Sequence, residues 1–129
     1  MPEGLDRYAL VAVGSAAGGC ARYAVAGLLP PRALSPFPWG TFVVNVTGCF
    51  VLGVFLTAAA ERFGLDPRWR LLVAVGFCGG YTTFSALAHE ASVMLDARSV
   101  ALAALNVAGS FVAGVLALRL GATLAARVS

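Results

Sequence analysis

The stretch GFCGGYTTFS, residues 76–85, lies in the middle of an apolar segment that runs from about residue 71 to residue 95. Residues 79–83 are two adjacent glycines, a tyrosine and two β-branched threonines, and the glycines and threonines are poor helix-forming residues. Backbone at membrane depth can leave the helical conformation only where protein or a wet cavity satisfies its polar groups. The stretch therefore predicts a membrane helix with a non-helical break near residues 79–83. The alternative is a continuous helix whose glycines permit close packing.

The composition around this stretch is that of a membrane protein. Of 129 residues, 60% are hydrophobic and 12% are charged, and the mean hydropathy is +0.86. A helix needs about 20 apolar residues to cross roughly 30 Å of hydrocarbon. Four such spans fit the chain, at about residues 8–29, 40–60, 71–95 and 100–120. We expect a single all-α transmembrane domain over residues 1–129, a multi-pass membrane protein with a broken third helix.

Arginine supplies all the basic side chains apart from one histidine, and the net charge is +3. Most arginines stand in loops and at helix ends, so we interpret them as membrane anchors rather than as a surface for nucleic acid. The side that holds both termini and the second loop carries more of them than the opposite side: Arg7, Arg62, Arg68, Arg70 and Arg127 against Arg32 and Arg98. This bias predicts that the termini are inside.

Polar side chains at membrane depth are candidate functional residues because lipid penalises them. Arg22 stands late in the first span, where it can snorkel to the nearby surface, pair with another group, or shape the entrance of an anion. Asn45 stands in the second span and offers two N–H donors to an anion. The alternative for Asn45 is a hydrogen bond between helices, which is common for such residues.

Further polar residues occur in the third and fourth spans. Asn106 and Ser110 stand four residues apart and share one helix face. Donors at this spacing can pass an anion along the helix. Thr82, Thr83 and Ser85 surround the predicted break. Their hydroxyls can donate to an anion, and carbonyls freed by the break can bind a cation.

Phe84 follows the break directly, and the edge of its ring carries partial positive charge that can contact a small anion. The alternative is ordinary packing. His89 and Glu90 stand near the end of the third span, where we expect them to reach the headgroup region rather than form a proton or metal site. The chain has no Ser-His-Asp set, metal-ligand cluster or phosphate loop, so we do not expect an enzyme.

Four segments together resemble one family of membrane proteins. They are GGCARY at residues 18–23, GTFVVNVTGCF at residues 40–50, GFCGGYTTFS at residues 76–85, and the pair Asn106 and Ser110. In this order and at this spacing they are similar to the CrcB/Fluc fluoride channels over essentially the whole chain. The third segment is the most specific of the four.

The resemblance implies an antiparallel dimer of four-helix subunits with two fluoride pores in the plasma membrane, which lowers cytoplasmic fluoride by passive export. It also implies a structural sodium ion at the dimer centre, held by backbone carbonyls. Matching positions assign those carbonyls to Gly79 and Thr82. In the same way, Asn45 and Phe84 match residues of the fluoride pathway. Asn106 and Ser110 match the fourth-helix polar track, where the family often has tyrosine and serine.

One position departs from the family pattern. The family usually has a second phenylalanine three residues after the first, and this chain has Leu87 there, which offers no ring edge. The unequal arginine distribution also suits an opposed homodimer poorly, so we hypothesise a paralogous partner inserted the other way. Two alternatives stay open, a nonconducting or obligate-heterodimer assembly subunit and a small proton-coupled multidrug exporter. The exporter would need a carboxylate near the middle of a span, and Glu90 stands too near an end.

Overall fold

The computed structural model describes residues 4–31 and 34–128, without the side chains of residues 62 and 63. Within this part of the chain all regular structure is helical. Four helical spans are long and apolar enough to cross a membrane: Leu5–Ala26, Trp39–Glu61, Pro67–Asp96 and Val100–Arg127. The expected all-α membrane protein with four spans is confirmed.

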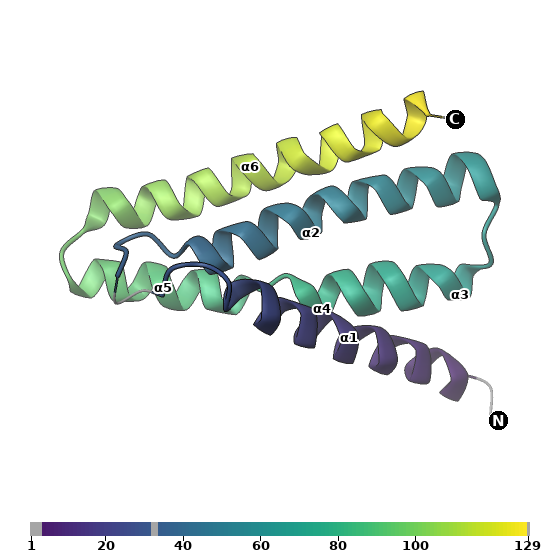
Figure 1. Cartoon of the computed structure of the whole chain (residues 1–129), viewed down its shortest axis with the longest axis horizontal. Coiled ribbons are helices and arrows are strands. Elements are labelled where there is room, and N and C mark those ends of the chain that lie inside the picture. Colours follow the sequence, from purple (N-terminus) through teal and green to yellow (C-terminus); the bar gives the residue numbers. More distant parts are fainter. Residues whose placement is uncertain (1–3, 32–33, 129) are drawn as a thin grey trace.

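The four spans consist of helical segments of different kinds. The first is α1 (Leu5–Ala26), and the second is α2 (Trp39–Ala58) with the π-helical η1 (Ala59–Phe63). The third contains α3 (Pro67–Trp69), the π-helical η2 (Arg70–Cys78), α4 (Gly79–Tyr81) and α5 (Phe84–Asp96), and the fourth is α6 (Val100–Arg127). Figure 1 shows α2 between α6 and the third span, while α1 packs against η2 and α4.

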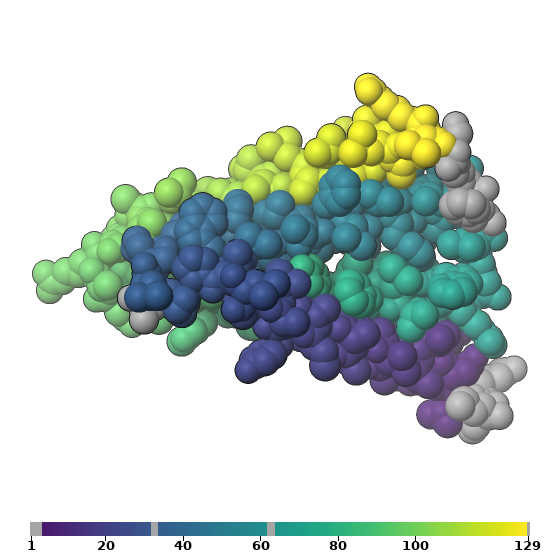
Figure 2. All heavy atoms as spheres, viewed as in Figure 1, coloured from purple at the N-terminus to yellow at the C-terminus, as the bar shows by residue number. Residues whose placement is uncertain are grey.

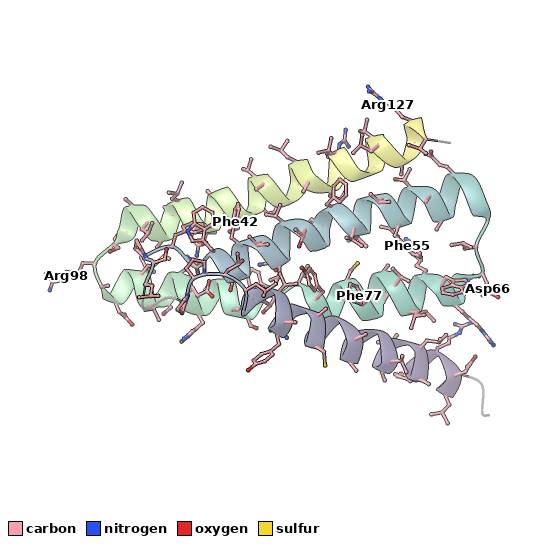
Figure 3. All side chains as sticks on the ribbon, in the orientation of Figure 1. Phe42, Phe55, Asp66, Phe77, Arg98 and Arg127 are labelled. Carbon is pink, nitrogen blue, oxygen red and sulfur yellow. The ribbon has the colours of Figure 1, made fainter. Side chains whose placement is uncertain are left out.

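Most charged residues lie near the two ends of the bundle, as is typical of a membrane-spanning protein. Figure 3 shows Arg98 at one end and Asp66 with Arg127 at the other, with Phe55 and Phe77 between them. Both termini lie at the end that carries Asp66 (Figure 1). The end with the termini is also the wider one, because α1 and α6 diverge toward it (Figure 2).

Two local contacts anchor these ends. At the wide end Arg68 forms an ion pair with Asp6 at 2.8 Å, and because both side chains are partly exposed it contributes little stability. At the narrow end Trp39 packs edge-on against Phe42, with ring centroids 5.8 Å apart, which suits an interfacial anchor. Arg32, part of the charge comparison above, lies outside the described residues.

Glycines let α1 approach the third span closely. Gly14 and Gly18 are buried in this contact, as small residues spaced four apart predict. A Cβ atom at Gly18 would strike the carbonyl oxygen of Phe77, and one at Gly80 would lie 2.6 Å from the carbonyl oxygen of Ser15. Gly80 therefore serves close packing, which was the alternative to a glycine break.

The third span is broken at its threonines (Figure 1). Thr82 has φ −85° and ψ 157°, and Thr83 has φ −148° and ψ 110°, so both are extended. Gly79 keeps helical angles of φ −63° and ψ −37°. The predicted break is thus confirmed, but it is narrower than the expected range 79–83, because the glycines remain in the helix that precedes it.

Candidate functional site

Asn45 of α2 holds the break in place. Its Nδ2 atom donates to the carbonyl oxygen of Thr83 at 3.1 Å, and its Oδ1 atom accepts from the backbone N–H of Thr83 at 2.7 Å. One side chain thus satisfies both backbone polar groups of Thr83, which permits an extended residue at membrane depth. The interhelical alternative for Asn45 is realised. The second N–H of the same nitrogen remains a potential anion donor.

Threonine hydroxyls close the two helix ends that the break creates. Thr82 Oγ1 donates to the carbonyl oxygen of Cys78 at 2.9 Å, at the end of the helix before the break. Thr83 Oγ1 accepts from the N–H of Ala86 at 3.2 Å and so caps the start of α5. The same oxygen lies 3.2 Å from Ser85 Oγ, which forms a hydroxyl pair beside the break.

Arg22 of α1 approaches the break from the opposite side. Its Nε atom donates to the carbonyl oxygen of Gly80 at 3.2 Å, so it satisfies one of the carbonyls near the end of α4. Of the alternatives for Arg22, structural pairing is therefore present. Its role at an anion entrance stays a prediction.

A groove-like cavity of about 530 Å³, open on one side of the chain, lies between α2, the third span and α6, and we call it the central cavity. Three of the four spans contribute sequence-predicted site residues to its lining: Asn45, Gly79, Thr82, Thr83, Phe84 and Ser110. Phe84 is 82% exposed, so its ring is left uncovered by the rest of this chain. The structure brings together side chains that are far apart in the sequence, and it surrounds them with mostly apolar walls.

Ser85, Asn106 and Arg22 lie outside the lining of the central cavity. Asn106 is buried behind Ser110, whose Oγ atom donates to Asn106 Oδ1 at 3.3 Å. Asn106 is 1% exposed, and its Nδ2 atom has no hydrogen-bond partner in the described part of the chain. A buried donor without an acceptor costs about 1–3 kcal/mol, so this amide marks a place where water or an ion would stabilise the fold.

A second hollow, of about 380 Å³, lies on the α1 side of the break, and we call it the outer hollow. Its lining is drawn from α1, α2 and the start of α5: Gly19, Arg22, Tyr23, Ala26, Thr41, Val44, Thr83 and Ala86. Thr83 is shared with the central cavity. The broken backbone therefore borders both spaces, with an arginine on one side and donor side chains on the other.

Sequence reasoning missed the pairing of Thr41 with Glu90. The Thr41 hydroxyl donates to Glu90 Oε1 at 2.5 Å, and Glu90 is 8% exposed. We expected His89 and Glu90 to face the headgroups. His89 is exposed, but Glu90 faces inward because Thr41 offers it a donor between the helices. The hydrogen bonds between Asn45 and Thr83 set the antiparallel register of α2 and the third span. Extended along both helices, that register would have predicted the contact between Thr41 and Glu90.

Tyr81 is a second structural residue that sequence reasoning missed. Its hydroxyl lies 2.9 Å from Thr47 Oγ1 on α2, and its ring stacks on Phe77 with centroids 5.7 Å apart. Beside it, a Cβ atom at Gly48 would strike the methyl group of Thr82. These contacts fix α2 against the last helical turn before the break, so the position of Thr82 is determined on two sides.

A cation at this site would depend on backbone oxygens. The described residues contain no group of three or more His, Cys, Asp or Glu side chains placed to hold a metal. Gly79 and Thr82 both line the central cavity, and a Cβ atom at Gly79 would have nothing within 4 Å. The backbone at Gly79 is thus open to the cavity rather than covered by side chains.

Comparison with known proteins finds one family and several named relatives to which the chain is similar. The family model described as "CrcB-like protein, Camphor Resistance (CrcB)" matches residues 9–122. The fluoride-specific ion channel FluC of Koribacter versatilis is 46% identical over 103 residues, which are 80% of this chain and 82% of that protein. The FluC of Solibacter usitatus is 41% identical over 121 residues (94% and 99%), and that of Chlorobium phaeobacteroides is 39% identical over 125 residues (97% of each).

Proposed function

Because this chain belongs to the family of CrcB-like proteins, we propose that it is a subunit of a fluoride-specific channel that lets fluoride leave the cell down its electrochemical gradient. Relatives that align with nearly its whole length carry the name of such a channel. The single observation that carries the proposal is the meeting of Asn45, Thr83, Phe84 and Ser110, from three spans, on one membrane-embedded cavity.

The chemistry of this cavity suits a small anion that holds its water tightly. A pore must replace that water with donors, which here are the second N–H of Asn45 and the hydroxyl of Ser110, whose proton would turn from Asn106 Oδ1 toward the anion. Phe84 adds the positive edge of its ring. Each contact is modest, and a series of modest sites lets an ion both enter and leave.

The outer hollow and the central cavity, on either side of the break, suggest a route for the anion. The positive charge of Arg22 attracts an anion to the outer hollow, and Thr83 separates that hollow from the central cavity. The hydroxyl of Ser85 lies beside Thr83, and Asn106 supports Ser110 from behind. The polar residues predicted from the sequence thus follow one another across the break.

A structural sodium ion fits the residues near the break. Unwound backbone at a helix break is a common ligand source for sodium in membrane proteins. Thr82 is the first of the two extended residues, and Gly79 presents open backbone. Their carbonyls would hold the ion, and it would offset the repulsion that a fluoride ion meets in low dielectric. Two carbonyls are too few for one cation, so a second subunit would supply the rest.

We place this second subunit on the face that exposes Phe84 and Gly79, in antiparallel orientation. A homodimer would combine two chains with the same charge bias, so we favour a paralogue inserted the other way. Leu87 lines the central cavity without a ring edge, which also favours a partner that completes the pathway.

Leu87 in the lining of the central cavity favours the second candidate function, a nonconducting assembly subunit. A chain with one weak pathway could serve mainly to hold a conducting partner. The proton-coupled exporter has no such support. Among the described residues, neither the central cavity nor the outer hollow is lined by Asp or Glu. A proton-coupled site would need a carboxylate there.

The proposal is tested by fluoride efflux from liposomes, followed with a fluoride electrode. Phe84→Ala is expected to reduce efflux strongly, because this ring lines the cavity and has little cover within its own chain, and the elution volume in detergent checks that assembly is retained. Tyr8→Ala is the matched control, since Tyr8 is 77% exposed on α1 and lines neither space. Asn45→Ala is expected to reduce efflux as well. Wild-type efflux in both Phe84→Ala and Asn45→Ala would remove these residues from the pathway.

A further inference from the structure

The fourth span turns an aromatic residue toward the central cavity that no feature of the sequence singled out. Val107, Phe111 and Val115, spaced four residues apart, all line this cavity and define the face of α6 that borders it. Phe111 is at the centre of this face, next to Ser110 in the chain. It is 72% exposed, so most of its ring has no cover from the rest of the chain.

The depth of Phe111 follows from the turn between α5 and α6. The two helices run antiparallel from a short turn, in which the N–H of Ser99 donates to the carbonyl oxygen of Met94 at 2.8 Å (Figure 1). Phe111 and Leu87 lie the same number of residues from Ser99, on opposite helices, and therefore at similar depth. Phe84 lies one helical turn, about 5 Å, further from the turn along α5.

We propose that Phe111 contacts the permeating anion and forms, with Phe84 and Ser110, one binding subsite in the central cavity. This inference rests on the proposed function and names a further residue of the same pathway. The ring of Phe111 brings a positive edge to the depth at which α5 presents the aliphatic Leu87. The subsite would thus combine aromatic rings from two helices with the Ser110 hydroxyl, whose proton would turn from Asn106 Oδ1 toward the anion.

Substitution of Phe111 by leucine removes the ring and keeps an apolar side chain of similar bulk. Fluoride efflux is expected to fall by about tenfold, with the same elution volume of the assembled protein in detergent. Phe111→Met is a second variant that keeps an unbranched apolar side chain, should the branched leucine disturb assembly. Tyr8→Leu is the matched control, because it removes an equally exposed ring outside both spaces.

A rescue variant separates contact with the anion from simple packing. Leu87→Phe returns a ring to the same depth from the facing helix, so the double variant Phe111→Leu, Leu87→Phe is expected to recover most of the efflux. Wild-type efflux in both Phe111→Leu and Phe111→Met would overturn the inference. So would a loss that Leu87→Phe does not repair, since that result assigns Phe111 to packing. If the unmodified protein conducts no fluoride with or without a partner, the proposed function itself fails.

Discussion

Asn45 shows how one side chain can serve both structure and transport. Its amide pairs with both backbone groups of Thr83, and the same nitrogen keeps an N–H for an anion. Asn45→Ala is expected to reduce flux because it removes this donor. The structure adds that this variant also leaves two backbone groups of Thr83 without their partner, so its loss of flux has two causes. Phe84 offers the cleaner test because it forms no such bond.

Thr83 gives a prediction at the same scale. Thr83→Val keeps the shape but removes the oxygen that caps α5, and the expected loss of stability is about 1 kcal/mol. Thr83→Ser keeps that oxygen and is expected to retain most of the stability. Thermal unfolding in detergent measures both variants. Equal midpoints for the valine and serine variants would show that the cap contributes nothing.

At the scale of elements, the third span shows which structural features the sequence predicts and which it does not. Its glycine-threonine stretch predicted a break, because such residues favour other conformations over the helix. The exact residues could not be predicted, because tertiary contacts decide them: Gly80 meets α1, while Asn45 captures the backbone of Thr83. The π-helical turns of η2 have no comparable residue pattern. They add residues to a turn without changing the apolar periodicity enough to be recognised.

The contact between α1 and the third span yields a prediction with a control next to it in the chain. Gly18→Ala would place a methyl group against the carbonyl oxygen of Phe77, so a destabilisation of about 1–3 kcal/mol is expected. Gly19→Ala meets nothing within 4 Å and is expected to be neutral or slightly stabilising. The unfolding midpoints of the two variants test this predicted difference in stability. If Gly18→Ala is as stable as Gly19→Ala, the helices do not approach as closely as described.

At the scale of the whole molecule, the sequence indicated four spans, their order and the polar side chains that line the central cavity, which are Asn45, Thr82, Thr83 and Ser110. The sequence could not show that Ser110 lines the same cavity as Phe84 and Asn45. Nor could it show that Asn106 is buried outside that cavity, because both depend on how α6 is rotated about its axis. The prediction for Glu90 was wrong because the sequence likewise does not show how α5 is rotated about its axis. A carboxylate near a helix end can face either headgroups or protein, and only the position of Thr41 decides between them.

The charge distribution leads to a prediction about assembly. The wide end carries Arg7, Arg70 and Arg127 in addition to the paired Arg68, whereas Arg98 stands at the narrow end. We expect this chain to insert mainly with its termini inside and to form the conducting dimer with a paralogue of opposite bias. Reconstituted alone, it is expected to release fluoride slowly, and co-expression with such a paralogue is expected to raise the rate. Full efflux from the chain alone would refute the preference for a paralogue.

The central claim is that the broken third span and its cavity conduct fluoride passively. The most direct measurement is anion efflux from liposomes that contain the protein with its partner subunit, loaded with fluoride or with chloride, at equal pH on both sides and with a potassium ionophore to balance charge. The account predicts rapid release of fluoride and retention of chloride. Retention of fluoride, or release that requires an imposed proton gradient, would contradict it.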